Sequence, residues 1–411
     1  MTTTSEQLVG AVLMIAPGAT RQDTPDGGAD LFWPQEGRRI ALGRTSLHVL
    51  QQFAVPATAS SVADRMERAT PGSRDAVTKA VITLVEVGAL CERDFLHRTT
   101  PSGRGAGLFG SPVVRIDDAM NGTDDFVVIG APYDHGVTYR PGARFGPEAL
   151  RRASTGVYQV EAGRRGMYDV ETDTRLLAGV GIADVGDMAA VSGGLGEDLL
   201  RSLEEVVALT ARSKKVPVVL GGDHSITLRV VDGLTRHHQR LGLLHFDAHH
   251  DYGEIRTGQP GQRVGIHHGN FLDWVVGNPA VECVAQFGIR QLTQSRPQES
   301  EKIQRWPGLT AVTADPADMI RRLPGDLVWH LTFDVDVLDP SVMPSTGTVL
   351  PGGYTYRQAL AVIGSLCDAL PVVGVDVVEY LPGDDEAPGV TTSALLARTL
   401  HRIAAASKRS L

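Results

Sequence analysis

Six short apolar runs recur along the C-terminal two-thirds of the chain, and each ends in glycine or polar residues. They read FVVIGAP, VPVVLGGD, LGLLHFDAHHD, VECVAQFGIR, LVWHLTFDVD and PVVGVDVVEY. Helical patterns separate these runs, and continuous apolar strands that alternate with helices are typical of a parallel sheet covered on both faces. The sequence therefore predicts an α/β fold, with a parallel sheet flanked by helices. In such sheets, ligand sites form beyond the carboxyl ends of the strands.

Residues 1–95 show a different pattern, with several short elements. We expect a strand at Leu8–Ile15, a hairpin of Leu31–Trp33 and Arg38–Leu42, and three helices that begin near Thr45, Ser60 and Arg74. This order resembles the PqqD-like winged-helix domains that bind precursor peptides in ribosomal-peptide maturation. The resemblance implies a small N-terminal α+β domain that binds a peptide. A cap over the active site or an oligomerisation domain is the alternative interpretation.

The segment that follows, residues 96–124, is rich in Gly, Pro, Ser and charged side chains. This composition predicts a linker. A second domain is then expected over residues 125–411.

Bulk properties exclude several classes of protein. The 411 residues carry a formal net charge of −9, which argues against nucleic acid or an anionic membrane as the main partner. The sequence has no apolar run of about 18 residues, so no transmembrane helix is expected. The N-terminus has no basic region before its short apolar stretch and does not resemble a signal peptide. Cys91, Cys283 and Cys367 show no CxxC spacing, so we expect buried thiols and a cytoplasmic location.

Acids and histidines gather at four of the expected strand ends. They are Asp223 and His224; Asp247, His249 and Asp251; Asp334 and Asp336; and Asp376 and Glu379. Because alternate side chains of an extended strand share a face, the side chains of Asp247, His249 and Asp251 are expected to converge. We interpret the neighbouring His245 and His250 as structural, packed away from this group.

The converging set contains two imidazoles and four carboxylates. This combination suits a hard-to-borderline divalent cation such as manganese. One ion does not need four carboxylates, whereas two ions about 3.5–4 Å apart do, and such a pair activates a water molecule near neutral pH. The alternative, a buried ion-pair network, is disfavoured because no Lys or Arg stands beside the acids.

These motifs resemble those of the arginase/agmatinase (ureohydrolase) superfamily. GGDHS, FDAHHD and FDVDVLDPS are similar to its three metal motifs and occur in its order, and GAPYDHGVTYRPGARFGPEALRRAS at 130–154 is similar to the agmatinase-type opening segment. The match runs from about Phe126 to the C-terminus. It implies an arginase-like α/β/α fold, two Mn²⁺ ions per chain and a homo-oligomer.

The resemblance also implies a role for each matching residue. His224 would bind one manganese ion and His249 the other, with Asp251 completing the first site and Asp336 the second. Asp247 and Asp334 would bridge the two ions. Asp223 is expected to orient the turn that carries His224.

Two further residues match the parts of the family's site that bind the substrate. Glu379 resembles the guanidinium-binding carboxylate, and a carboxylate can accept paired N–H donors from such a planar group. IHHGNF at 266–271 resembles the family's His-Gly-x-x-Phe segment, which makes His268 the expected proton shuttle. A shift of one position in the match would assign that role to His267.

We therefore expect a hydrolase that converts a guanidino group to urea and an amine. The substrate is expected to be agmatine, a guanidino acid, another small guanidino compound, or an arginine side chain in a bound precursor peptide. The Asn and Ser positions that hold an α-amino acid in arginases are not recognisable, which disfavours free L-arginine. The alternatives are a single-zinc deacetylase-like hydrolase on the same fold and a non-catalytic binding scaffold.

Overall fold

The computed structural model describes residues 12–15, 20–33, 38–53, 57–87, 89–92, 107–157, 166–188, 196–253, 265–294 and 296–409. The chain divides into two compact units, residues 1–98 with 189–202 and residues 99–188 with 203–411.

The N-terminal unit combines two small antiparallel sheets with three helices. Its strands are β1 (Val12–Ile15), β2 (Thr20–Asp23), β3 (Ala29–Trp33), β4 (Arg38–Leu42), β5 (Ala57–Thr58) and β6 (Leu90–Glu92). Strand β1 lies between β5 and β6, and β3 lies between β2 and β4. The expected hairpin is present as β3 and β4, which pair antiparallel. Strands β2, β5 and β6 were not predicted, and residues 8–11 of the first expected strand lie outside the described residues.

The three expected helices are present as α1 (Arg44–Gln51), α2 (Ala59–Ala69) and α3 (Arg74–Glu86). Helix α2 begins where the Thr58 side chain accepts a hydrogen bond from the N–H of Ser61, as an N-cap does. The apolar stripes of α2 and α3 face one core, in which Phe53, Val62 and Val81 are almost fully buried. This unit therefore has a hydrophobic core of its own.

The segment expected to be a linker differs from the prediction. Residues 96–106 lie outside the described part of the chain, but residues 107–124 include the 3-10 turn η2 (Leu108–Gly110) and helix α4 (Ile116–Asn121). Leu108 and Phe109 are fully buried in the core of the second unit. Residues 107–124 are therefore folded, because two large apolar side chains outweigh the Gly and Pro content of the segment.

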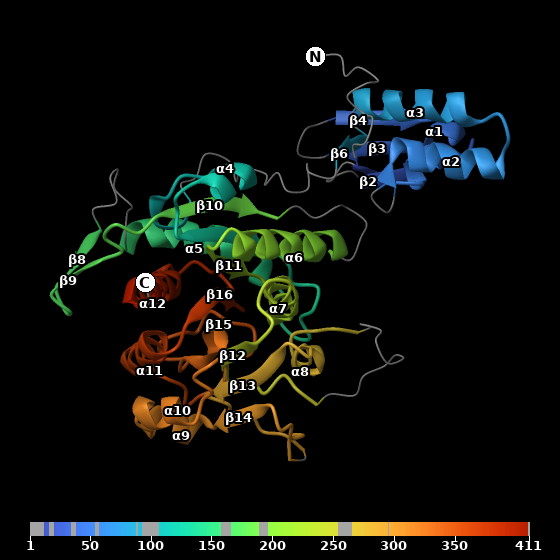
Figure 1. Cartoon of the computed structure of the whole chain (residues 1–411). Coiled ribbons are helices and arrows are strands. Elements are labelled where there is room, and N and C mark those ends of the chain that lie inside the picture. Colours follow the sequence, from blue (N-terminus) through green and yellow to red (C-terminus); the bar gives the residue numbers. More distant parts are fainter. Residues whose placement is uncertain are drawn as a thin grey trace. The chain divides into compact units, whose positions relative to one another are not determined.

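An eight-stranded parallel sheet forms the centre of the second unit, as the alternating apolar runs predict (Figure 1). Its order is β10-β7-β11-β16-β15-β12-β13-β14. In chain order the strands are β7 (Phe126–Ala131), β10 (Ile182–Asp187), β11 (Val216–Gly221), β12 (Leu241–Phe246), β13 (Val281–Phe287), β14 (Ile303–Trp306), β15 (Val328–Asp334) and β16 (Val372–Val378). The central strands are buried along their length, which explains their continuous apolar sequences.

Helices flank this sheet, with α11 and α12 on one side and α7 and α8 on the other (Figure 1). Besides α4, the helices of this unit are α5 (Gly146–Val157), α7 (Thr227–Thr235), α8 (Leu272–Gly277), α9 (Gly308–Thr313), α10 (Pro316–Arg321), α11 (Tyr356–Ala369) and α12 (Ala387–Arg409). Helix α6 (Glu197–Arg212) is divided, with residues 197–202 assigned to the N-terminal unit and the rest to this one. A hairpin of β8 (Met167–Asp169) and β9 (Thr174–Leu176) lies apart from the main sheet. This arrangement confirms the predicted α/β/α architecture.

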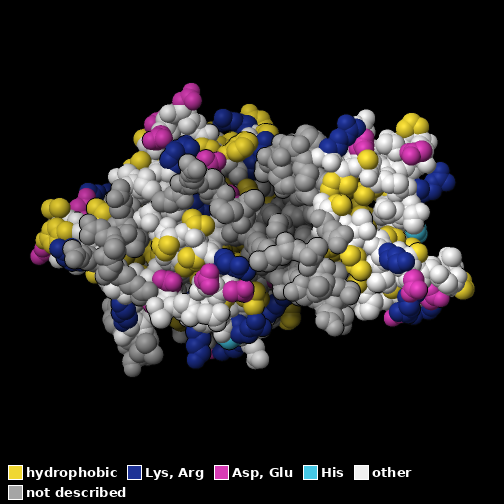
Figure 2. Space-filling view, turned by 90° about the horizontal axis from the view of Figure 1, so that it is seen from above, with side chains coloured by type: hydrophobic (Ala, Val, Ile, Leu, Met, Phe, Trp, Pro, Cys, Tyr) yellow, Lys and Arg dark blue, Asp and Glu magenta, His cyan; other side chains and the backbone are white. Residues whose placement is uncertain are grey.

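The described surface mixes both signs of charge. On the face drawn in Figure 2, basic and acidic side chains are interspersed with apolar ones. Among the described residues, none of the helices combines the length and apolar character that a bilayer span requires. Cys283 and Cys367 are buried free thiols.

Candidate metal centre and substrate cavity

The residues of the candidate site follow the carboxyl ends of neighbouring strands. His224 lies in the short 3-10 turn η4 (His224–Ile226) after β11, and Asp247, His249 and Asp251 follow β12. Asp334 ends β15, Asp336 lies in the next 3-10 turn, η5 (Val335–Val337), and Glu379 directly follows β16. The parallel sheet brings these ends to one edge, so residues up to 155 positions apart meet there.

The turn that carries His224 depends on two neighbouring residues. A Cβ atom at Gly222 would lie 1.6 Å from the carbonyl oxygen of Tyr133, so only glycine fits there. Asp223 caps the turn, since its carboxylate accepts hydrogen bonds from the N–H groups of Ser225 (2.9 Å) and Gly136 (2.7 Å). Burial and the charge of Glu379 raise the pKa of Asp223 to about 7. Asp223 therefore lies where the sequence predicted an orienting residue.

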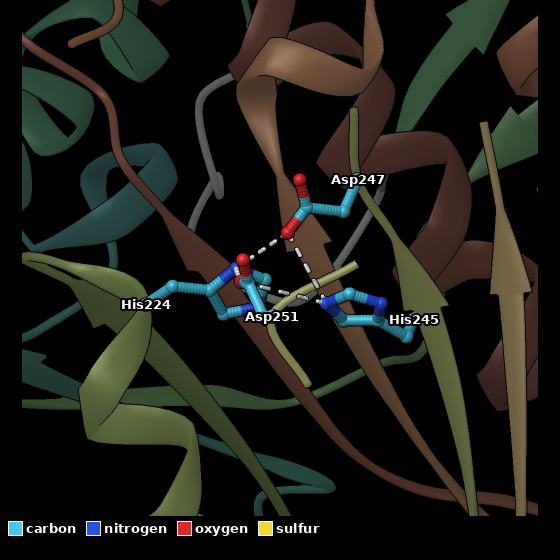
Figure 3. Close-up of side chains that lie close together, drawn as sticks. All are labelled: His224, His245, Asp247 and Asp251. Atoms are coloured by element: carbon cyan, nitrogen blue, oxygen red, sulfur yellow. Dashed lines mark ion pairs between the residues drawn. The ribbon is translucent and has the colours of Figure 1, made fainter. Parts of the chain in front are cut away.

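Three carboxylates surround one nitrogen of His224. Its Nδ1 lies 2.9 Å from Asp247 Oδ2, 3.4 Å from Asp251 Oδ2 and 3.2 Å from Asp334 Oδ2. In Figure 3 the side chains of His224, Asp247 and Asp251 point toward one another. All four residues are almost completely buried.

A second group forms around His249. Its Nδ1 lies 3.0 Å from Asp336 Oδ2 and 3.3 Å from Asp247 Oδ1. Asp247 thus directs one oxygen toward each histidine, and the two groups have this carboxylate in common. The structure brings together all six residues that the sequence proposed as metal ligands.

The hydrogen bonds of the site fit a cation better than an ion-pair network. The Thr332 hydroxyl donates its proton to Asp376 Oδ1 (2.5 Å), so it can only accept from His224 Nε2, which is 2.9 Å away. That assigns the proton of the neutral imidazole to Nε2 and leaves a lone pair on Nδ1. His224 Nδ1 and Asp247 Oδ2 are both buried without a hydrogen-bond partner, although they lie only 2.9 Å apart. Two such acceptors facing each other are stabilised by a cation between them.

The pKa values of these groups indicate the same excess of negative charge. Burial by itself would lower the pKa of His249, but Asp336 and Asp247 raise it to about 12. The pKa of His224 is likewise raised to about 9 against the effect of burial, mainly by Asp247. Burial and the neighbouring carboxylates hold the pKa of Asp251 and Asp334 well above the usual range. A divalent cation would relieve this repulsion.

The expectation that His245 and His250 pack away from the group was wrong. His245 and Asp247 are two residues apart and share a face, and His245 Nε2 lies 3.1 Å from Asp247 Oδ2 (Figure 3). His250 lines the cavity beside His249 because the strand ends at Phe246 and the chain then turns. At Asp251 the backbone reaches a φ of 47°, so alternation of side chains does not persist beyond the strand.

Glu379 and His268 lie beside the acidic cluster. Glu379 Oε1 accepts a hydrogen bond from the N–H of His224 (2.9 Å) and lies 3.0 Å from His268 Nδ1. Its Oε2 is buried without a hydrogen-bond partner, and its backbone has a φ of 61°. On the other side of the His268 ring, Nε2 lies 2.7 Å from Thr138 Oγ1. Burial by itself would lower the pKa of His268, but Glu379 raises it above its ordinary value.

A cavity of about 150 Å³ opens in front of these groups. His268 lines it, whereas the neighbouring His267 is not among its lining residues. The backbone N–H of His267 donates to Asn270 Oδ1, and its ring Nδ1 accepts from the N–H of Gly269. Thr138, Gln291 and Thr348 also line the cavity. Sequence reasoning did not find these three, because isolated neutral side chains in loops carry no spacing signal.

Comparison with known proteins identifies the origin of this arrangement. The sequence profile of the arginase family matches residues 124–405. The chain belongs to the arginase family. Proclavaminate amidinohydrolase of Streptomyces clavuligerus is 32% identical over 306 residues, which cover 70% of this chain and 90% of that protein. An agmatinase of Neisseria meningitidis is 36% identical over 64% of this chain and 81% of its own length.

Solved structures agree with the sequence comparison. A hypothetical agmatinase from Burkholderia thailandensis superposes with a TM-score of 0.63 at 25% identity, covering 74% of this chain and 92% of that one. The arginase family shares a binuclear metal centre, and the buried His and Asp groups of this chain lie where such a centre can be held. The protein is therefore a hydrolase of the ureohydrolase type, as the sequence motifs indicated.

Proposed function

We propose that this protein is a dimanganese amidinohydrolase, which uses water to convert a guanidino group to urea and releases an amine. The observation that carries the proposal is Asp247, whose Oδ2 faces His224 and whose Oδ1 faces His249 within a buried acidic cluster. Carboxylate and imidazole ligands together suit Mn²⁺.

Six side chains would hold the ions. His224 and Asp251 belong to one site, His249 and Asp336 to the other, and Asp247 and Asp334 would bridge them. When bound, two such ions supply a water molecule that is activated as a nucleophile near neutral pH.

Glu379 would bind the guanidinium group of the substrate. Its Oε1 is already occupied by His224 and His268, whereas Oε2 is free to accept an N–H from the substrate. A buried carboxylate oxygen without a partner is costly, and a cationic donor removes that cost.

His268 would carry the proton that the departing amine requires. Its ring lies between Glu379 and Thr138 at the cavity, and Glu379 raises its pKa, which favours the protonated ring that a general acid requires. Because His267 is not among the residues that line the cavity, we assign this role to His268.

The substrate is proposed from the chemistry of the site and the range of relatives. Agmatinase, guanidino acid hydrolase and guanidinobutyrase are among the similar proteins, so small guanidino compounds are the first class to test. Arginine side chains of a peptide held by residues 1–95 are the second class, which rests on the resemblance of that region to PqqD-like domains.

Urea release tests the proposal directly. The Mn²⁺-loaded protein is incubated with agmatine, 4-guanidinobutyrate, L-arginine and an arginine-containing peptide, and urea is measured. We expect urea from at least one compound and about two Mn²⁺ ions per chain. Failure of all guanidino compounds would falsify the activity, and one bound zinc ion with amide hydrolysis would favour the deacetylase-like alternative. Binding without any turnover would favour a scaffold.

A further inference from the structure

A row of polar side chains crosses the interior of the parallel sheet directly below the candidate metal centre. Strands β16, β15, β12, β13 and β14 are neighbours in that order (Figure 1). Their paired positions carry Asp376, Thr332, His245, Gln286 and Arg305 in register. We call these five residues the polar row.

The polar row is unusual because of where it lies. Its first four members are fully buried, in strands whose other residues are mostly apolar. Each buried polar group without a partner costs on the order of 1–3 kcal/mol, so such groups persist only where their hydrogen bonds are satisfied or serve a site. Core packing alone therefore does not account for these buried polar residues.

One end of the polar row fixes His224. Asp376 Oδ2 lies 2.7 Å from His330 Nε2 and accepts from the Thr227 hydroxyl, while Oδ1 accepts from Thr332. The Thr332 hydroxyl is thus left to accept from His224 Nε2. In the neutral ring, the form that can bind a metal ion, this end of the row therefore places the proton on Nε2 and directs the bare Nδ1 toward the carboxylates.

The other end fixes His245 by the same logic. Arg305 Nε can only donate, and it lies 2.6 Å from Gln286 Oε1, so that atom is the amide oxygen. Gln286 Nε2 then donates to the carbonyl of His250 (2.8 Å) and to His245 Nδ1 (3.2 Å). His245 Nδ1 is therefore an acceptor, and the proton of the neutral ring lies on Nε2.

We infer that His245 is a positioning residue for the shared carboxylate and not a metal ligand, and that Gln286 and Arg305 set its tautomer from the edge of the sheet. Its Nε2–H group lies 3.1 Å from Asp247 Oδ2, and since neither atom has a hydrogen-bond partner, the contact between them is an electrostatic one. A nitrogen that carries a proton cannot coordinate an ion, although by proximity alone His245 belongs to the same group as His224, Asp247 and Asp251. The inference rests on the proposed function, since it assigns a role relative to the dinuclear centre.

The polar row gives His224 and His245 opposite tasks. His224 presents a bare nitrogen toward the carboxylates, whereas His245 presents an N–H that stabilises charge on Asp247 and limits its rotation. Partners of this kind behind metal ligands typically alter metal affinity or activity by about 10- to 100-fold. Arg305 on strand β14 thereby influences the centre without touching any of its six proposed ligands.

Counting bound ions separates a positioning residue from a ligand. Mn²⁺ is titrated into the metal-free wild type and into His245→Phe, His245→Gln and Gln286→Leu, with free Mn²⁺ followed by electron paramagnetic resonance. We expect two ions per chain at saturation in every variant. Affinity should fall about 10- to 100-fold in His245→Phe and Gln286→Leu, and recover in His245→Gln, whose amide N–H replaces Nε2–H. Val284→Ala, in the same buried strand as Gln286, is the matched control for lost packing and should keep the wild-type affinity.

A saturated His245→Phe variant with only one ion would make His245 a ligand and overturn the inference. Unchanged affinity in both His245→Phe and Gln286→Leu would overturn it as well. A wild type that binds fewer than two ions or releases no urea contradicts the proposed function instead, so the two failures are distinguishable.

The tautomer itself can be measured in the metal-free protein. Histidine ¹⁵N shifts distinguish protonated from bare ring nitrogens, and the signals of His245 are identified by their loss in His245→Gln. We expect Nε2–H in the wild type. In Gln286→Glu, a carboxylate opposite Nδ1 should place a proton on Nδ1, which is bare in the wild type. A wild type with Nδ1–H would overturn the inference without reference to any ion.

Discussion

The two compact units of this chain differ in where their charged side chains lie. In the described part of residues 12–92, charged side chains form exposed pairs such as Arg21–Asp23 and Arg74–Asp64, and the buried residues are apolar. In the second unit, acids and histidines are buried together at the carboxyl ends of the strands. An exposed ion pair contributes little to stability, whereas a buried cluster of like charges is costly and marks a candidate functional site.

The largest effect is expected at the carboxylate that the two histidine groups share. Asp247→Asn keeps the shape of the side chain but removes the charge that both groups use. We expect loss of at least one Mn²⁺ ion and a fall in urea release of more than about 10³-fold. Metal analysis and the urea assay measure both, and a variant that keeps two ions and full activity would contradict the shared-carboxylate arrangement.

The second-largest effect is expected at His268, the proposed donor of a proton to the departing amine. His268→Asn should bind Mn²⁺ normally but lower kcat by about 10²- to 10⁴-fold, because it removes a general acid and not a ligand. The pKa of His268 is raised by Glu379, so the wild type should retain the protonated ring above pH 6.5 and lose activity as pH rises through the folded-state pKa. That alkaline limb should vanish in His268→Asn. A pH profile with the same limb in both proteins would assign the proton to another group.

A core substitution in the N-terminal unit tests whether the metal site depends on the stability of that unit. Phe53 is 1% exposed, so Phe53→Ala should destabilise that unit by about 3–5 kcal/mol. Mn²⁺ affinity should stay at the wild-type value, because the acidic cluster belongs to the other unit. Denaturant unfolding and a Mn²⁺ titration on the same sample test this, and parallel losses of both would show that the units depend on each other.

The smallest effect is expected at an exposed pair. Arg74→Ala removes the Arg74–Asp64 contact, in which both side chains are about half exposed. The free energy of unfolding should change by about 0.5 kcal/mol or less, with urea release unchanged. A thermal melt is a sufficient measurement, and a large shift would mean that this pair is not the solvated contact that its exposure indicates.

Much of the fold followed from apolar periodicity. The continuous runs predicted the parallel sheet, and a sheet that is buried on both faces leaves its strand ends as the place for acids. Five of the six clustered residues were recognisable because Asp and His recur at spacings of two, whereas His224 was found through the resemblance of the GGDHS motif. That rule was misapplied at His245, which shares a face with Asp247, and it lapsed at His250 because the strand ends at Phe246.

Other features had no local signal. The polar row is invisible in the sequence because its members, such as Thr332 and Gln286, come from different strands and meet only through register. The buried Leu108 and Phe109 lay in a segment whose composition indicated a linker. In both cases the decisive contacts are between residues far apart in the chain, which spacing rules do not reach.

Two carboxylates of the cavity, Asp251 and Glu379, have backbones in the left-handed region, with φ of 47° and 61°. A non-glycine residue in this region raises the free energy of the folded state by on the order of 1 kcal/mol or more, and the contacts of the surrounding fold offset this strain. The two carboxylates are therefore fixed in position in the folded protein, so ligand binding does not have to order them. A glycine at either position would relieve the backbone strain but would also remove the carboxylate. At position 251, asparagine is the replacement that removes the charge and best retains the backbone conformation.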